Sequence, residues 1–276
     1  AILTADKQAM PEQQLVTQVQ HHQQLIRDLG GDQHLTDPDI DPTQLIQSAE
    51  HLRWLSREPQ PFGDVLSLQP VNAVMLTWYR NNIMHLLALP SLIACLLVNR
   101  RRGIGLERLK SAIDLIYPYI AEELCGTQPA ATEAALASMT QLGLVRREAD
   151  IVLPAAQHSE QRLPLLHLSK LVNETLERMY IVISLAHHGQ YTRESLCQSS
   201  QAAAQQMARL HGINAPEFFD QGLFDRFIDA LLTNEHLQKN EHQILVTNST
   251  IAEILHNART VIDDKIRFAL TPLRNV

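Results

Sequence analysis

The residues of this chain best suited to chemistry form a polar cluster directly ahead of an apolar segment. Its members are Trp78, Tyr79, Arg80, Asn81, Asn82 and His85. An arginine can bind a carboxylate or phosphate through two parallel hydrogen bonds, and a histidine can exchange a proton near neutral pH. Such polar groups are stable beside an apolar helix only when they have hydrogen-bonding partners. The cluster therefore predicts either a buried network that joins helices, or a face that meets another part of a larger protein.

One pair of residues has the spacing that acyl transfer to a hydroxyl group would use. His34 stands five positions before Asp39, and a carboxylate that orients an imidazole makes it an effective general base. The pair lies in the acidic, proline-containing segment 34–42, which is typical of turns and contains nothing that would exclude water or stabilise an oxyanion. We therefore reject the pair and identify no catalytic residue in the chain.

Cofactor and metal sites are not indicated either. The three cysteines, Cys95, Cys125 and Cys197, are far apart and odd in number, which fits neither a zinc site nor a set of disulfides and favours a reducing cytoplasm. The adjacent pairs His21-His22 and His187-His188 do not share a helix face, so we expect surface positions for them. There is no glycine-rich phosphate loop.

Charge and hydropathy argue against two broad classes of protein. With 23 basic and 30 acidic residues the net charge is −7, so the chain lacks the basic surface of a nucleic-acid-binding protein. The longest apolar run, residues 86–98, contains Pro90 and Ser91 and is shorter than the roughly 20 residues that span a membrane. We expect a buried core helix, with a proline kink, and keep an interfacial helix as the alternative.

The elements around the cluster follow a repeated pattern. Residues 1–15, 95–109 and 182–196 each combine the end of an apolar helix, a polar turn, one apolar residue and a helix start. We expect a mainly α protein with three winged-helix-like units, each of three helices and a short β-hairpin. The predicted boundaries are 1–70 for a first unit truncated at its N-terminus, 71–157 and 158–250 for the others, and 251–276 for a docking helix.

Turn residues and apolar spacing place several of these elements. The third helices of the units are predicted at 42–57, 132–142 and 216–233. The extended segments are predicted at 65–68, at 144–147 with 151–153, and at 234–238 with 244–246. A single amphipathic helix is predicted over 251–270.

The cluster also carries a family resemblance. Residues 79–85, Tyr-Arg-Asn-Asn-Ile-Met-His, closely resemble a segment of the bacterial membrane-associated glycerol-3-phosphate acyltransferases. Residues 210–220, Leu-His-Gly-Ile-Asn-Ala-Pro-Glu-Phe-Phe-Asp, resemble the same family near its C-terminus, with weaker similarity at 174–178. Within residues 174–178 we predict that Arg178 lies at the surface. Because the likeness is to the C-terminal part only, and the chain starts without Met, we expect a fragment of a longer protein.

The resemblance implies a function for the parent protein. It would transfer a fatty acyl group from acyl carrier protein or acyl-CoA to the first hydroxyl of glycerol 3-phosphate, at the cytoplasmic face of the bacterial inner membrane. The catalytic residues would lie upstream of Ala1. The present chain would be inactive alone and would support the catalytic domain, with no cofactor, and the polar cluster would lie at that interface.

A basic patch is the second candidate site. Its members are Arg100, Arg101, Arg102, Arg108 and Lys110. We expect the three consecutive arginines to face solvent at the end of a helix, where they would meet an anionic membrane surface, an acidic carrier protein, or water alone. Two alternatives to the acyltransferase remain, a winged-helix DNA-binding protein and a protein-interaction scaffold, and the acidic third helices disfavour DNA.

Overall fold

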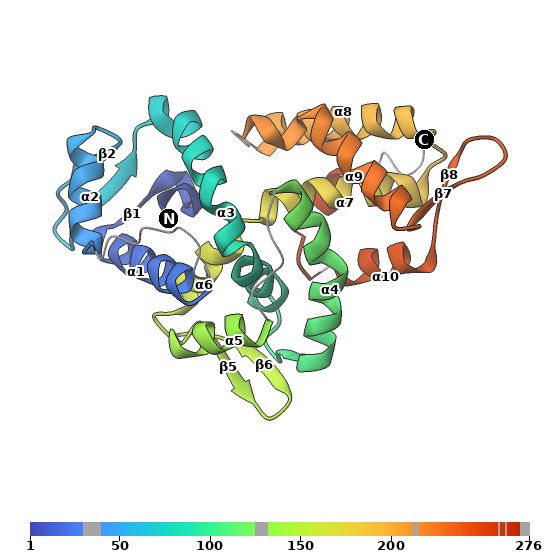
Figure 1. Ribbon diagram of the computed structural model, residues 1–276. Helices are drawn as coiled ribbons and strands as arrows, with labels where there is room; N and C mark the ends of the chain where they lie inside the picture. Colours follow the sequence, from blue (N-terminus) through green and yellow to red (C-terminus); the bar gives the residue numbers. More distant parts are fainter. Residues whose placement is uncertain (30–39, 125–131, 212–214, 259, 263, 271–276) are drawn as a thin grey trace. The chain divides into compact units, whose positions relative to one another are not determined.

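A computed structural model describes residues 1–29, 40–124, 132–211, 215–258, 260–262 and 264–270 (Figure 1). The chain is mainly helical with small antiparallel sheets, as predicted. It divides into two compact units, Ala1–Val172 and Asn173–Val276, and each is described by itself. The rejected pair His34 and Asp39 lies outside the described residues.

The first part of unit 1 is a small sheet covered by helices. Its elements are η1 (Ile2–Thr4), η2 (Asp6–Gln8), β1 (Ala9–Pro11), α1 (Glu12–Leu29), α2 (Pro42–His51), β2 (Leu55–Glu58) and β3 (Val65–Leu68). The strand order is β1-β3-β2, and Leu66 of β3 lies between Met10 and Arg57. Met10, Leu66 and Ile46 of α2 are buried in one apolar core, so the sheet and α2 hold each other in place.

The boundary of α2 corrects one prediction. The helix begins as expected at Pro42, where the side chain of Asp41 accepts a hydrogen bond from the Thr43 amide at 2.8 Å. It ends at His51 rather than at residue 57, because Arg53 adopts a left-handed conformation with φ 57°. The following residues then pair with β3 as strand β2. A non-glycine residue in this conformation gives no helix-stop signal in the sequence.

The second part of unit 1 has the same order of elements around a second sheet. It contains α3 (Pro70–Val98), β4 (Ile104–Gly105), α4 (Leu106–Glu123), α5 (Thr132–Gln141), β5 (Val145–Glu148), β6 (Ile151–Pro154) and α6 (Arg162–Ser169). The strand order is β4-β6-β5. Gly103 enters β4 with φ +69°, and a β-carbon there would collide with the backbone of Val152. Only glycine fits this turn.

The C-terminal half of α3 is the central helix of unit 1. Every residue from Leu87 to Val98 is buried, which confirms the predicted core helix. Ser91 donates a hydrogen bond to the Leu168 carbonyl at 2.7 Å and accepts one from the Val172 amide at 3.2 Å. Among the described residues, α3 is the one helix long and apolar enough to cross a membrane, and 72% of its most apolar window is buried within the protein. A buried fraction of this size is typical of a core helix.

Unit 2 is built around one buried helix. Its elements are α7 (Asn173–His188), α8 (Arg193–His211), η3 (Pro216–Phe219), α9 (Gln221–Thr233), β7 (Leu237–Lys239), β8 (Leu245–Thr247), α10 (Ser249–Ala258) and α11 (Asp264–Ala269). Residues 175–186 of α7 are buried, and Phe218 and Phe224 are fully buried beside them. The predicted helix over 251–270 is wrong, because α10 ends at Ala258 and α11 begins at Asp264.

Candidate docking face and charged clusters

The predicted polar cluster lies on the N-terminal half of α3, and it is largely open to solvent. Trp78 and Tyr79 are 71% and 55% exposed. Asn82 and His85 are also exposed, whereas Arg80 and Asn81 are half-buried. A buried network that joins helices is therefore the wrong interpretation for the four exposed residues. What the exposed residues meet in a larger protein stays a prediction at this point.

Two local contacts organise the cluster. The Arg80 guanidinium donates from Nε and Nη2 to Asn81 Oδ1, both at 3.2 Å. The Tyr79 ring stacks on Trp54, which lies between α2 and β2, with ring centroids 5.8 Å apart. Such stacking contributes about 0.5–1.5 kcal/mol beyond the area that it buries. The stacking ties the Tyr79 side chain of α3 to the segment between α2 and β2.

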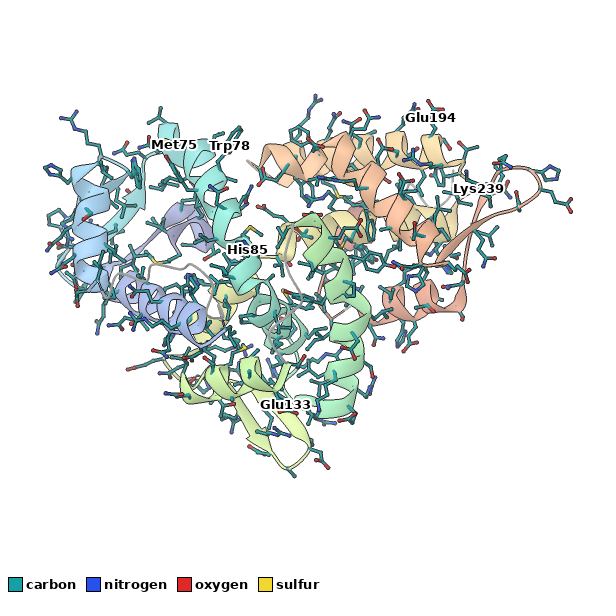
Figure 2. All side chains as sticks on the ribbon, viewed as in Figure 1. Met75, Trp78, His85, Glu133, Glu194 and Lys239 are labelled. Atoms are coloured by element: carbon teal, nitrogen blue, oxygen red, sulfur yellow. The ribbon has the colours of Figure 1, made fainter. Side chains whose placement is uncertain are left out.

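The exposed side of α3 extends beyond the predicted cluster. Met75, Trp78 and His85 lie along it (Figure 2). We call this surface the α3 face; its members, at helical spacings of three and four, are Val71, Val74, Met75, Trp78, Asn82 and His85. Val71, Val74 and Met75 are 85%, 48% and 39% exposed. Contiguous exposed apolar side chains with a tryptophan at their centre are typical of a surface that binds another protein or a membrane.

The members of the basic patch differ in their exposure to solvent. Arg101, Arg102 and Arg108 are exposed, and Arg100 is half-buried. Burial, and then the nearby charge of Arg108, lower the pKa of Arg100. Lys110 lies 3.0 Å from Glu133 and 3.5 Å from Glu107, so its charge is partly neutralised. The exposed positive charge is thus concentrated at the α3–β4 turn and the start of α4.

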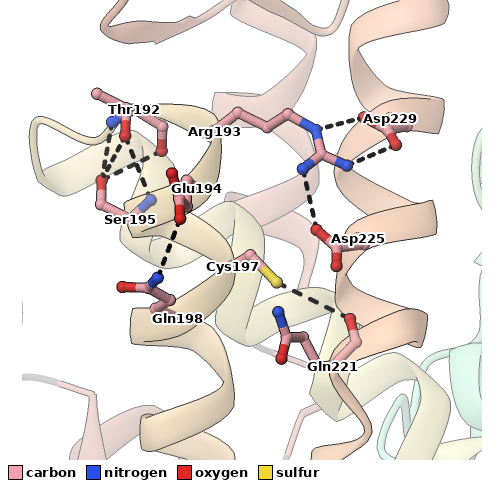
Figure 3. Close-up of polar contacts among 9 residues, drawn as sticks. All are labelled: Thr192, Arg193, Glu194, Ser195, Cys197, Gln198, Gln221, Asp225 and Asp229. Carbon is pink, nitrogen blue, oxygen red and sulfur yellow. Dashed lines mark hydrogen bonds and ion pairs between the residues drawn. The ribbon is translucent and has the colours of Figure 1, made fainter.

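Ion pairs form a cluster in each unit that the sequence did not predict, because their partners meet only in the folded chain. Arg57 contacts Glu12, Glu50 and Asp64 at 2.7–2.8 Å. In unit 2, Arg193 donates to both oxygens of Asp229, at 2.7 and 2.6 Å, and to Asp225 at 3.0 Å (Figure 3). These hydrogen bonds lower the pKa of Glu12 and of Asp229. The clusters join helices to each other or to a strand, and they hold no reactive group.

The described residues offer little for catalysis. They contain no group of three or more His, Cys, Asp or Glu side chains placed to hold a metal ion. Cys197, on α8, has a pKa raised to about 11 by burial, so its thiol stays protonated at neutral pH and is a poor nucleophile. Cys95 donates to the Ser169 carbonyl at 2.9 Å inside the core.

His22, on α1, gives a testable pH dependence. Burial holds its pKa well below the usual 6.5, so the folded protein keeps the ring neutral while the unfolded chain takes up a proton below about pH 6.5. The stability contribution is thus present above pH 6.5 and declines as the pH falls. Between pH 8 and pH 5.5 the free energy of unfolding should therefore fall, with His22 contributing at most about 1.4 kcal/mol.

Urea unfolding at the two pH values, followed by circular dichroism, measures this effect. His22→Gln should remove roughly that part of the decline, whereas His256→Gln, on an exposed position of α10, should leave it unchanged. An identical decline in the His22→Gln protein would show that His22 is protonated equally in both states.

Comparison with known proteins identifies the family. Residues 1–240 match the family model described as the glycerol-3-phosphate acyltransferase C-terminal region. The chain belongs to this family. It is 33% identical over 279 aligned residues to glycerol-3-phosphate acyltransferases of Pseudomonas paraeruginosa (strain DSM 24068 / PA7) and Pseudomonas aeruginosa (strain UCBPP-PA14). The one from Pseudomonas fluorescens (strain SBW25) is 32% identical. Each alignment covers 98% of this chain and 33% of the relative, so the chain spans about a third of their length.

Two of the segments that resemble the acyltransferase family meet inside unit 2. Arg178 of α7 donates to the Glu217 carbonyl of η3 at 3.2 Å and to the Thr175 hydroxyl at 3.3 Å. The residue is only 3% exposed, so its prediction as a surface residue is wrong. Its sequence neighbours Glu177 and Met179 are buried as well, because α7 is enclosed on all sides. The buried guanidinium of α7 therefore contacts η3, which lies within one of the two segments that resemble the acyltransferase family.

Proposed function

We propose that this chain is the C-terminal helical region of a glycerol-3-phosphate acyltransferase, and that it supports a catalytic domain which precedes it in the parent protein. The family membership supports the general function. The relatives are about three times as long as the chain, which leaves room for such a domain. The scarcity of catalytic groups among the described residues is consistent with a supporting role.

The observation that carries this proposal is the α3 face. Its apolar members and Trp78 are exposed in the isolated chain, although they continue the helix that forms the core of unit 1. A partner that covered the tryptophan and the three other apolar side chains would stabilise the assembly by about 25 cal/mol for each Å² of apolar surface removed from water. We propose that the catalytic domain covers this face, and that Asn82 and His85 supply the polar contacts at its rim.

By the same proposal, the parent enzyme transfers a fatty acyl group from acyl carrier protein or acyl-CoA to the sn-1 hydroxyl of glycerol 3-phosphate. This is the first step of phospholipid synthesis, and we place it at the cytoplasmic face of the inner membrane. The acyl donor, the pathway and the location are proposals about the parent protein, and they rest on its membership of the family.

We also propose that the chain repeats a winged-helix-like unit. The orders β1-α1-α2-β2-β3 and β4-α4-α5-β5-β6 support this, together with the matching strand orders of the two sheets in unit 1. The elements α8, α9, β7 and β8 of unit 2 follow a similar course. The boundaries 1–70, 71–157, 158–250 and 251–276 belong to this proposal.

DNA binding is the less favoured function for such units. A recognition helix needs basic or amide side chains that reach bases and phosphates. α5 has neither Lys nor Arg, and α9 carries Asp225 and Asp229 against Arg226. These helices would repel the phosphate backbone.

The proposal is tested by assaying acyl transfer to glycerol 3-phosphate from labelled acyl-CoA and from acylated carrier protein. The purified 276-residue chain should show no turnover with either donor, whereas the full-length parent should be active. Turnover by the isolated chain that is lost in His34→Ala would restore the rejected His34 and Asp39 pair and refute the supporting role.

We propose that Arg100, Arg101 and Arg102 of the basic patch bind an acidic surface, either anionic lipid or carrier protein. Each charge near an anionic membrane contributes about 1 kcal/mol and is weakened by salt. Changing Arg100, Arg101 and Arg102 to Glu should therefore reduce co-sedimentation with anionic vesicles, or pull-down of acyl carrier protein, at least ten-fold at low salt. If binding is unchanged in both experiments, the three arginines are only solvated residues at the end of a helix.

A further inference from the structure

The members of the α3 face form a straight and narrow band along the helix. Alternate steps of four and three residues along the chain connect Val71, Met75, Trp78, Asn82 and His85. Since an α-helix has about 3.6 residues per turn and rises about 1.5 Å per residue, these positions fall within an arc of about 80° over a length of roughly 20 Å. This alternation is the spacing by which one helix packs along another at a shallow angle.

The structure of unit 1 limits the band on its sides. Ile83 lies roughly a third of a turn away from the centre of the band. On the same flank, the Tyr79 ring is already stacked on Trp54. The opposite side of the helix carries Thr77 and Met84, which are both 5% exposed and belong to the interior of unit 1. The band therefore has about the width that a single packed helix covers.

The chemistry of the band changes along its length. Val71, Met75 and Trp78 make its first half apolar, and the Trp78 side chain is largely exposed. Asn82 and His85, which are exposed as well, make its second half polar. A helix that lies in a membrane interface keeps its polar residues on the side away from the lipid, whereas Asn82 and His85 lie on the same side as Trp78. This order of side chains favours a protein partner, which can supply both apolar contacts and hydrogen bonds.

A second copy of the chain fits this band poorly. If two α3 faces packed in opposite directions about Trp78, the apolar Val71 of one copy would lie against the polar His85 of the other. If they packed in the same direction, the two Trp78 rings would lie in one layer and neither could enter a gap between smaller side chains. The partner therefore has a sequence of its own. The chain spans 33% of its relatives, and the remaining length can provide such a partner.

We propose that a single α-helix of the catalytic domain packs lengthwise along the α3 face. Apolar side chains of that helix would lie against Val71 and Met75, and a small residue would admit the Trp78 ring. Side chains that form hydrogen bonds would lie against Asn82 and His85. The inference rests on the proposed function for the origin of the helix, and it goes beyond that function in naming the element that binds and its alignment with α3.

Cysteine labelling tests the shape of the contact. Val71→Cys, Met75→Cys and Asn82→Cys are labelled with a maleimide reagent in the full-length parent and in the 276-residue chain, and mass spectrometry of the peptides gives each labelling rate. All three positions should react at least about ten-fold more slowly in the parent than in the chain, because the core of an interface excludes solvent. Ile83→Cys, on the flank, and Ala137→Cys, at an exposed position of α5, are the matched controls and should differ by less than about two-fold.

Photo-crosslinking tests whether the partner is a helix. Met75 and Asn82 are replaced, one at a time, by the photoreactive amino acid benzoylphenylalanine in the parent, and the adducts are mapped by mass spectrometry. The two sets of adducts should fall in one segment of the catalytic domain. Their centres should lie about seven residues apart, because Met75 and Asn82 are separated by two helical turns and two helices that pack lengthwise keep this spacing.

Three results would overturn the inference. Slow labelling of all three band cysteines in the 276-residue chain would show that the chain itself covers the face. Adducts in separate segments of the catalytic domain, or equally slow labelling of Ile83→Cys in the parent, would refute the single helix and leave the proposed function intact. Equal labelling rates in the parent and the chain, with no adduct in the catalytic domain, would refute both the helix and the proposed cover of the α3 face.

Discussion

A full-length acyltransferase that carries Met75→Glu and Trp78→Glu is expected to lose at least ten-fold in turnover, while the isolated chain with both changes keeps its stability. Both side chains are exposed on the α3 face, so the substitutions disturb no core of unit 1. If the catalytic domain covers this face, two carboxylates must lose their water without a partner, which costs several kcal/mol. Acyl transfer by the parent, and urea unfolding of the isolated chain, measure the two effects.

The matched control is Ile151→Glu, which changes another exposed apolar residue, 45% exposed on β6, and should leave turnover within two-fold. Equal turnover for the α3 double variant and this control would mean that no part of the parent covers the α3 face. Loss of stability in the isolated chain would instead show that Trp78 belongs to the fold of unit 1.

Arg178→Ala is expected to destabilise unit 2 by about 3 kcal/mol. The guanidinium is 3% exposed and binds the Glu217 carbonyl and the Thr175 hydroxyl. Hydrogen bonds from a charged group contribute about 1.5–3 kcal/mol, and removing a buried charged partner leaves the groups that it bound without compensation. The same change should lower the activity of the parent only as far as it lowers the folded fraction.

Chemical unfolding of the Arg178→Ala chain measures this loss. Arg226→Ala, at an exposed position of α9, is the comparison within unit 2 and should change the free energy of unfolding little. A loss below 0.5 kcal/mol for Arg178→Ala would indicate that Arg178 reaches solvent and that η3 holds its position without it.

The helices were predictable where apolar spacing and turn residues agreed. The start of α2 at Pro42 and the extents of α5 and β3 follow the predicted ranges. Strands β1 and β4 were missed because segments of three and two residues carry no alternation. They form because β3 and β6 offer unpaired edges, and that information lies elsewhere in the chain.

The candidate site was predicted only in its polar part. Arg80 and Asn81 were predicted as site residues because polar residues before an apolar run are unusual. Val71, Val74 and Met75 were not predicted as site residues, since apolar residues at the start of an apolar helix are normally interpreted as core. Whether such residues are buried depends on which elements cover the helix: α3 is buried from Leu87 to Val98, whereas its residues Val71, Val74 and Met75 are exposed. Arg178 was misplaced for the same reason, because α7 is enclosed by partners that its own sequence does not specify.

The strand pairing has a consequence for the synthesis of the protein. All described strands pair within three separate sheets, and the stretch of chain that forms one sheet does not overlap with the stretch that forms another. On the ribosome, residues 9–68 can complete the first sheet before the strands of the second have been translated, and only packing such as that of α5 on α1 must await later residues. Because no strand has to wait for a partner from another sheet, few strand edges stay open to other nascent chains. The growing polypeptide can thus be ordered segment by segment, in the sequence in which it emerges.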